Sequence, residues 1–233
     1  MKYKSRAIPI HYIKHGESSI IAKIFTEEMG LISFIVKGIR NKKSKKKLVL
    51  FQPLQLVMVE GKYVAKKNLQ VITDINLYSY KKDSKIYIEK TFLWIFISEI
   101  LSKVLKENQI DKNLFSFIWN LKIGASQNNT LIFNPDLLFL IDLTKHLGFY
   151  PLKNLSEGMY FDLELGQFTK KIPRKNYINK ENTCYFKKLI NNADTPIPLK
   201  NRKALLLNIF QYYALQHHEL KNIASHKILQ HIS

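Results

Sequence analysis

The chain changes its hydrophobic pattern once, near residue 84, and this change limits what it can fold into. Before that point, short segments rich in β-branched residues lie between turn signals, and no window shows helical spacing. After it, apolar residues recur every three or four positions, as they do in amphipathic helices. The sequence therefore predicts an α+β protein, with a strand-rich first domain over residues 1–80 and a mainly helical second domain over residues 81–233.

We expect five strands in the first domain. Turn signals at His15–Ser18, Glu28–Gly30 and Glu60–Lys62 separate the apolar segments. Five short strands in so few residues indicate a small closed or partly closed barrel. In the oligonucleotide-binding (OB) barrel, one member of that set, the face and loops commonly hold single strands. The expected strands are Ala7–Ile13, Ser19–Phe25, Leu31–Val36, Leu54–Val59 and Leu69–Ile75.

A strongly basic stretch follows the third expected strand. Seven cations occur among eleven residues with no carboxylate between them, and the apolar run Leu48–Phe51 comes next. The pattern predicts a strand, a basic loop and another strand. Because like charges at this density repel one another, the loop favours a polyanion beside it. The cations are Lys37, Arg40, Lys42, Lys43, Lys45, Lys46 and Lys47.

A second group of cations, Lys62, Lys66 and Lys67, precedes the last expected strand. Two basic loops beside one face are typical of a single-strand binder. Aromatic residues that could stack on bases are also present, although core packing is the favoured interpretation for each except Tyr63, which we expect to be exposed. These aromatic residues are Tyr12, Phe25, Phe34, Phe51 and Tyr63.

The charge balance of the whole chain also favours a polyanion partner. It carries 37 Lys and Arg against 18 Asp and Glu, a formal net charge of +19. Only four of the cations are Arg, and a codon bias toward AT-rich codons would favour Lys without any functional reason. That bias does not explain the scarcity of carboxylates, so we favour a polyanion partner. Residues 1–80 hold fifteen cations and five carboxylates, and are about twice as basic per residue as the rest.

The second domain is expected to be helical apart from one β-hairpin, near residues 159–170 and turning at Gly166. Asn134-Pro135 is a helix start signal, and Gly148 ends the same helix. The other expected helices are Ile86–Leu105, one from about Leu114 to Gly124, Ala204–Gln216 and Leu220–Gln230.

The expected helix Ala204–Gln216 carries more apolar residues than a narrow core stripe needs. Most of them are expected in the core, but a surplus could form a groove for a partner peptide, with nearby cations to receive its acidic residues. The candidate partner-binding residues are Lys200, Arg202, Lys203, Leu206, Ile209 and Tyr213.

No motif in the chain indicates catalysis or a metal. There is no P-loop, no Gly-x-Gly-x-x-Gly and no His-Glu-x-x-His, and the adjacent His217 and His218 would point to different faces of a helix. The single cysteine, Cys184, excludes an intramolecular disulfide and is expected to be buried. The sequence predicts a binding protein rather than an enzyme, with no cofactor and no metal. Since no apolar signal segment or membrane-length run is present, we expect it in the cytoplasm.

Several segments resemble the RecO family of bacterial recombination mediators. In the first domain these are Tyr12–Ser19, Phe25–Phe34 and Val36–Arg40 with Lys43–Lys45. In the second, Leu147–Pro151 is similar to the family's Leu-Gly-x-x-Pro. The segment Arg202–Tyr213, followed by Leu220–Asn222 and Leu229, resembles its closing helices.

The resemblance implies an OB barrel followed by a helical domain in a bacterial DNA repair and recombination protein. It implies binding of single- and double-stranded DNA, annealing of complementary strands, and loading of the RecA recombinase onto DNA coated by single-strand binding protein (SSB). The implied partners are RecR and the acidic carboxyl-terminal tail of SSB, with association with the nucleoid during repair.

Two points qualify what the resemblance implies. Many relatives carry a four-cysteine zinc module after the Leu-Gly-x-x-Pro segment, and this chain has none of those cysteines, so we expect the hairpin near Phe161 to stand in its place without metal. The alternative to a DNA-binding mediator is a protein-interaction adaptor that binds acidic partner tails and touches DNA only incidentally.

Overall fold

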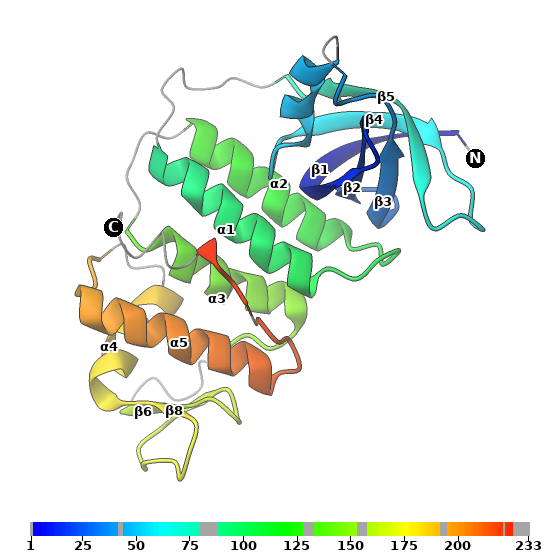
Figure 1. Cartoon of the computed structure of the whole chain (residues 1–233). Coiled ribbons are helices and arrows are strands. Elements are labelled where there is room, and N and C mark those ends of the chain that lie inside the picture. Colours follow the sequence, from blue (N-terminus) through cyan, green and yellow to red (C-terminus); the bar gives the residue numbers. More distant parts are fainter. Residues whose placement is uncertain are drawn as a thin grey trace. The chain divides into compact units, whose positions relative to one another are not determined.

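The computed structural model of the chain describes residues 2–41, 44–79, 88–127, 133–152, 158–191, 195–220 and 222–225 (Figure 1). The chain forms two compact units, residues 1–129 and 130–233. The boundary predicted at residue 80 falls among residues 80–87, which lie outside the described residues.

In the described part of the first unit, five strands form a closed barrel in the order β1-β2-β3-β5-β4. Strand β1 pairs antiparallel with both β2 and β4, and its register shifts between Pro9 and His11, so one long strand serves both neighbours. Strands β3 and β5 pair in parallel at Phe34–Gln70 and Ile35–Val71, which closes the barrel. This is an OB-type barrel, as predicted. The strands are β1 (Lys2–His15), β2 (Ser19–Thr26), β3 (Gly30–Val36), β4 (Val57–Lys62) and β5 (Gln70–Leu77).

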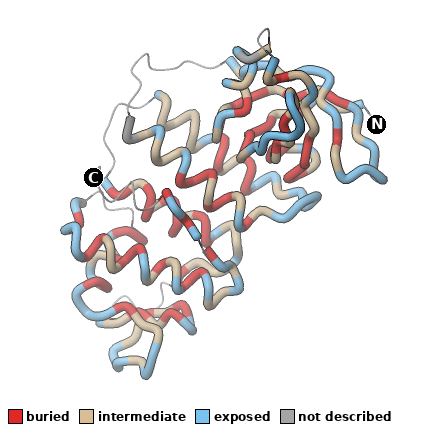
Figure 2. Tube along the Cα trace, viewed as in Figure 1, coloured by how far each residue is buried: buried red, intermediate tan, exposed pale blue. Residues whose placement is uncertain are grey.

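The barrel interior is filled by alternate residues of its strands, as the period-two pattern requires (Figure 2). Ile20, Ala22 and Ile24 of β2 face the core, and Phe34 of β3 joins them with no exposed surface. Each fully buried large apolar side chain contributes roughly 1.5–3 kcal/mol to the stability of the barrel.

The prediction of a strand over Leu48–Phe51 is wrong. These residues belong to a 3₁₀ helix, η1 (Lys45–Phe51), between β3 and β4. In a 3₁₀ helix side chains three apart lie above one another, so Leu48 and Phe51 can both face the barrel core, whereas in a strand they would point to opposite sides. Phe51 is fully buried and Leu48 partly so, while Val49 is 51% exposed.

Two helices also belong to the first unit, α1 (Ile88–Val104) and α2 (Lys112–Gln127), close to the predicted ranges. Ser98 of α1 donates a hydrogen bond to the backbone oxygen of Ile10 in β1. Phe115 of α2 packs edge-on against Phe25 of β2, with ring centroids 5.4 Å apart. The outward-facing Phe25 is thereby buried, and the two helices cover part of the barrel wall.

The second unit contains helices and a small sheet of the order β7-β6-β8. The predicted caps of α3 are confirmed, with Asn134 before it and Gly148 after it at a φ of +86°. The predicted hairpin is confirmed too, with Gly166 at its turn; β8 and α4 were not predicted. The elements are α3 (Pro135–Leu147), β6 (Tyr160–Asp162), β7 (Gln167–Thr169), β8 (Tyr177–Ile178), α4 (Lys180–Ile190) and α5 (Leu199–Leu215).

Two further expectations for this unit concern Cys184 and the last helix. Cys184 is exposed rather than buried, because the buried face of α4 is formed by neighbours such as Thr183 and Phe186. Of the helix expected over Leu220–Gln230, Leu220 and 222–224 are not helical, and most of the remainder lies outside the described residues. No helix in the described ranges has the length and apolar character needed to cross a membrane.

Candidate nucleic-acid interface

The loops that carry the predicted cations begin on neighbouring strands of the barrel. The strand register shows this, because His15 at the end of β1 pairs with Ser19 at the start of β2. Likewise Val36, which ends β3, pairs with Ile20. The end of β4 pairs with the start of β5 through Lys62 and Val71. The β1–β2 turn and the first residues of the basic loop therefore lie at one end of the barrel. The β4–β5 loop starts from the strand next to β3, where Val71 of β5 pairs in parallel with Ile35. We call the surface around these three loops the basic end of the barrel.

Most of the predicted cations that the structure describes are exposed. Lys37, Lys62, Lys66 and Lys67 are exposed at the basic end, and Lys46 and Lys47 are exposed on η1. Arg40 is partly buried. Lys42 and Lys43 lie outside the described residues, as does the side chain of Lys45, whose backbone begins η1.

The basic loop is attached to the barrel on both sides of its lysines. At its start, the backbone N–H of Arg40 donates to the Ser18 carbonyl oxygen at 2.9 Å, and Ile39 is buried in the barrel core. At its end, Phe51 is fully buried. Gly38, at a φ of +68°, makes the tight turn after β3 that a residue with a side chain would adopt only under strain. The loop is thus held in place while Lys46 and Lys47 point to solvent.

The β4–β5 loop is organised by Gln70, which sequence reasoning missed. This side chain is 3% exposed and accepts a hydrogen bond from Val64 N–H at 2.8 Å. Its amide nitrogen donates to the backbone oxygens of Val64 and Lys67, at 2.9 and 2.5 Å. Three hydrogen bonds from one buried amide hold the loop closed and leave Lys66 and Lys67 outside. The sequence did offer one signal for this role, because Gln70 is a polar residue near the start of the apolar segment Leu69–Ile75.

Sequence reasoning also missed an apolar row on the outer surface of the barrel. Ile13 pairs with Ile21, Ile21 with Ile35, and Ile35 with Val71, so the four lie in register across β1, β2, β3 and β5. Ile13 is 57% and Val71 is 52% exposed, and the row continues to Lys62 on β4. An exposed apolar strip beside cations can contact sugars and bases while the cations meet phosphates.

The aromatic candidates lie mostly elsewhere. Phe25, Phe34 and Phe51 are buried, in agreement with the favoured core interpretation. Tyr12 is 36% exposed. Tyr63 was expected to be exposed but packs partly against the barrel core, because it directly follows β4.

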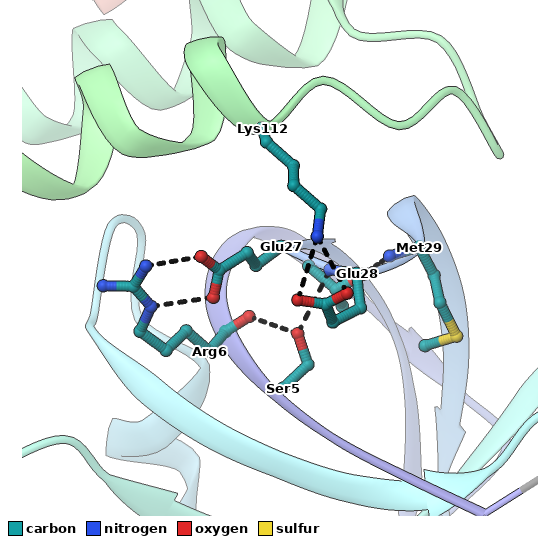
Figure 3. A network of polar contacts seen from close by, with 7 residues as sticks. Ser5, Arg6, Glu27, Glu28, Met29 and Lys112 are labelled. Carbon is teal, nitrogen blue, oxygen red and sulfur yellow. Dashed lines mark hydrogen bonds and ion pairs between the residues drawn. The ribbon is translucent and has the colours of Figure 1, made fainter.

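Charges at the opposite end of the barrel are paired (Figure 3). Arg6 donates to both carboxylate oxygens of Glu27, and Lys112 of α2 lies 3.1 Å from Glu28 in the β2–β3 turn. The hydrogen bond from Arg6 lowers the pKa of Glu27, and the same bond raises the pKa of Arg6.

The described part of the basic end shows no such pairing. Among the described residues, no ion pair is formed by Lys37, Lys46, Lys47, Lys66 or Lys67. Lys4 of β1 and Glu60 of β4, in contrast, form an ion pair at 2.7 Å. These five lysines are therefore available to an anionic ligand as far as the described residues show.

The partner-binding candidates of the second unit are mainly core residues. Arg202 is 4% exposed, and its Nη2 donates to both carboxylate oxygens of Asp136 at 2.8 and 2.7 Å. Leu206, Ile209 and Tyr213 are buried, and the Tyr213 hydroxyl donates to Leu140 O at 2.6 Å. These four side chains are therefore not accessible to a partner in this structure.

The two remaining candidates differ from these four. Lys200 is exposed and Lys203 partly so. They keep only their charge as a reason for contact with an acidic partner.

A closed five-stranded OB-type barrel with an uncompensated cationic end belongs to a class that commonly binds nucleic acid through its face and loops. Comparison with known proteins agrees with this class. The family model for the recombination protein O N terminal matches residues 1–80.

Curated relatives extend the match to the whole chain. The DNA repair protein RecO of Azobacteroides pseudotrichonymphae is 31% identical over all of this chain and 99% of its own length. That of Flavobacterium psychrophilum is 29% identical with the same coverage. That of Bacteroides fragilis is 30% identical over 75% of this chain and 72% of its own. The chain belongs to the RecO family of DNA repair proteins, which confirms the resemblance noted in its sequence.

Proposed function

We propose that this chain binds single- and double-stranded DNA without sequence specificity, anneals complementary strands, and helps to load a recombinase onto SSB-coated DNA. The observation that carries the proposal is the set of exposed lysines, unpaired among the described residues, on loops that begin on neighbouring strands of an OB-type barrel. Membership of a family of DNA repair proteins supports it.

The proposed contact is ionic. Lys37, Lys62, Lys66 and Lys67 at the basic end, with the lysines of η1, neutralise phosphates and release the counterions that surround DNA. Lys42, Lys43 and Lys45, which are continuous in sequence with Lys46 and Lys47, are proposed to act with them. If roughly five phosphates are neutralised, the logarithm of the affinity for single strands falls against the logarithm of salt with a slope of about −3.5.

Sequence-independent binding follows from the chemistry of these groups. Lysine carries a flexible point charge that suits a phosphate, and base sequence is read by directed hydrogen bonds in a groove. The apolar row from Ile13 to Val71 offers contact area but no donors or acceptors, so it cannot discriminate one base from another.

Annealing requires no chemical step in this proposal. Two complementary strands repel each other through their phosphates, and cations bound to both reduce that repulsion while leaving the bases free to pair. The chain acts as a mediator rather than an enzyme, and needs no cofactor.

The proposed protein partners are RecR and the carboxyl-terminal tail of SSB. Family membership supports both, and the net charge of +19 favours an acidic tail. The proposed setting is the bacterial cytoplasm, at the nucleoid during repair. Four of the six residues first considered for this role are buried, so Lys200 and Lys203 are the remaining candidates for contact with the acidic tail.

The test is a DNA-binding titration of one charge-reversed variant. Replacing Lys42, Lys43, Lys45, Lys46 and Lys47 by Glu is expected to abolish most binding of single- and double-stranded oligonucleotides while the thermal unfolding midpoint stays unchanged. The matched control replaces the same five lysines by Arg and is expected to bind like the wild type. Unchanged DNA affinity of the Glu variant at low salt would remove the basic loop from the mechanism.

The adaptor alternative is separated by a second titration with a peptide of the SSB tail. Tight peptide binding without any salt-dependent DNA binding would favour the adaptor. Salt-dependent DNA binding that is abolished in the Glu variant would favour the mediator.

A further inference from the structure

The second unit has a cationic loop of its own, between β7 and β8. Within the six residues Lys170–Lys175 lie four cations and no carboxylate: Lys170, Lys171, Arg174 and Lys175. All four are exposed, and Ile172 between them is 62% exposed. Figure 1 shows the loop, in yellow, extending beyond the strands of the small sheet. The function proposed for the barrel makes no use of it.

The loop is held at both ends. Thr169 Oγ1 accepts from Lys171 N–H and donates to the Lys171 carbonyl, each at 3.2 Å. At the other end, Asn176 adopts a φ of +53° and donates through Nδ2 to Glu164 Oε1 at 2.7 Å. Gln211 of α5 donates to Asn176 Oδ1 at 2.6 Å. The backbone is thus organised before any ligand binds, which lowers the entropy cost of binding.

Two of the four cations of this loop, Lys171 and Arg174, have no carboxylate partner within the described residues. Lys175 lies 3.3 Å from Glu164, whose carboxylate is already shared with Asn176, and these hydrogen bonds, that of Asn176 first, lower the pKa of Glu164. Over the same described ranges, neither Lys171 nor Arg174 forms an ion pair.

The helix that follows adds to the positive charge. Lys180 and Lys188 are exposed on α4, which begins two residues after β8. The acidic residue of its first turn, Glu181, accepts a hydrogen bond from Asn201 at 2.8 Å. Residues 158–191 hold seven cations and three carboxylates, a density of positive charge comparable with that of the barrel.

A nucleic-acid backbone fits this surface better than an acidic peptide does. A peptide tail that is both acidic and apolar needs a groove for its apolar side chains, and the apolar side chain among Lys170–Lys175 that is strongly exposed, Ile172, stands on a projecting loop. A phosphate backbone needs only cations spaced along an exposed surface. The planar guanidinium of Arg174 can bind one phosphate through two parallel hydrogen bonds.

We infer that the β7–β8 loop is a second contact site for a nucleic-acid backbone, separate from the basic end of the barrel, so that one chain holds two strands. The inference rests on the proposed DNA-binding function and gives it a stoichiometry. Annealing by a single chain then follows, because each strand has its own site.

Native mass spectrometry of the full-length chain with an oligonucleotide of about eight nucleotides, within the usual site size of an OB fold, tests the inference. The wild type is expected to bind two oligonucleotides per chain. The loop variant Lys171→Gln, Arg174→Gln and the barrel variant Lys46→Gln, Lys47→Gln, Lys66→Gln, Lys67→Gln are each expected to bind one. Two controls, Lys103→Gln with Lys106→Gln and the charge-preserving Lys171→Arg with Arg174→Lys, are expected to bind two.

A salt titration gives an independent readout. With the barrel site removed, the remaining single-strand binding is expected to depend on salt. The loop variant in that background should reduce the slope by about 0.7 for each phosphate that is no longer neutralised. Circular dichroism melting checks that the exposed substitutions leave the fold intact.

The outcomes separate this inference from the proposed function. One oligonucleotide per wild-type chain, or two per chain of the loop variant, overturns the second site and leaves the barrel site standing. If the loop variant loses an oligonucleotide while the barrel variant still binds two, the barrel site is overturned instead. If the loop variant loses an acidic peptide but keeps both oligonucleotides, the loop is a peptide site and the inference is wrong.

Discussion

Arg40 Nη1 donates a hydrogen bond to the backbone oxygen of Gly16, 3.0 Å away, across 24 residues of sequence. The bond joins the first turn of the basic loop to the β1–β2 turn, and the backbone bond from Arg40 to Ser18 lies beside it. The guanidinium therefore has two roles available to it. One donor holds the loop in place. The other guanidinium donors form no hydrogen bond within the described ranges and can meet a phosphate.

The two roles of Arg40 can be separated by two substitutions. Arg40→Lys keeps the charge, so DNA affinity is expected to fall only slightly. Arg40→Ala removes both the charge and the bond to Gly16, and should reduce the single-strand salt slope by about 0.7 if Arg40 neutralises one phosphate. Hydrogen exchange of residues 37–41 measures the structural role, and faster exchange is expected in Arg40→Ala. Equal exchange in all three proteins would show that the bond to Gly16 does not hold the loop.

Gln70 is expected to control the β4–β5 loop and, through it, DNA affinity. Gln70→Glu keeps an acceptor for Val64 N–H but loses the amide donors to Val64 O and Lys67 O, and it places a carboxylate at a buried site. Leaving buried groups unpaired costs about 1–3 kcal/mol each.

Urea unfolding and an oligonucleotide titration measure the two effects of Gln70→Glu. Both stability and affinity should fall, whereas the exposed Gln52→Glu has the same charge change and should spare stability. A Gln70→Glu variant as stable as the wild type would contradict this account.

The β2–β3 turn depends on the absence of a side chain at Gly30. This residue has a φ of +72°, and a Cβ placed there would lie 2.1 Å from the Gln109 backbone oxygen. Gly30→Ala must therefore displace the α1–α2 connection, whose Asn108 N–H donates to Leu31 O at 3.0 Å. Backbone strain of this kind costs of order 1–3 kcal/mol before the clash is counted.

Gly16→Ala is the matched control, because Gly16 also has a positive φ, +57°, but no atom within 4 Å of the added Cβ. Gly16→Ala should lose only the unfolding free energy that corresponds to backbone strain at a positive φ, without any loss from a clash. Chemical denaturation compares the two, and equal losses of unfolding free energy would show that the approach of Gln109 is unimportant.

Acid is expected to weaken the paired end of the barrel. The hydrogen bond from Arg6 lowers the pKa of Glu27 below its usual value of 4.5, and bonds from Lys23 and then Ser33 lower the pKa of Glu107. A carboxyl whose folded pKa is depressed contributes stability that is present above its unfolded pKa and disappears as pH falls through the folded pKa.

Glu27→Gln should therefore be less stable than the wild type at pH 7, with the difference shrinking as pH falls below about 4.5. Unfolding free energies between about pH 7 and pH 3 measure it, and a difference that does not change with pH would contradict the ion-pair origin. Glu17→Gln, in the exposed β1–β2 turn, serves as the control.

The sequence was sufficient for features that depend on local pattern. Alternating apolar residues locate the five strands, and the Asn134-Pro135 and Gly148 signals bound α3, because each is decided by its own few residues. The run Leu48–Phe51 was misjudged since four apolar residues fit a strand or a 3₁₀ turn equally well. The burial of Leu48 and Phe51 on the same side decides between them.

Features that depend on register or on distant partners were out of reach. The outer row from Ile13 to Val71 exists only once four strands are aligned. Helix α4 was missed because Asn182 and Thr183, which are buried, read as polar surface. Arg202 was considered for partner binding because its carboxylate partner stands 66 residues earlier in the chain.

The buried pair of Arg202 with Asp136 gives a last prediction, which separates a structural role from partner binding. Removing one member leaves a buried charge without its partner, a loss of about 3–5 kcal/mol, so Asp136→Leu and Arg202→Met should each destabilise the second unit strongly. The double variant replaces both charges by apolar groups and should be more stable than either single variant. Urea unfolding of the four proteins forms a double-mutant cycle, and additive losses would mean that the pair does not couple.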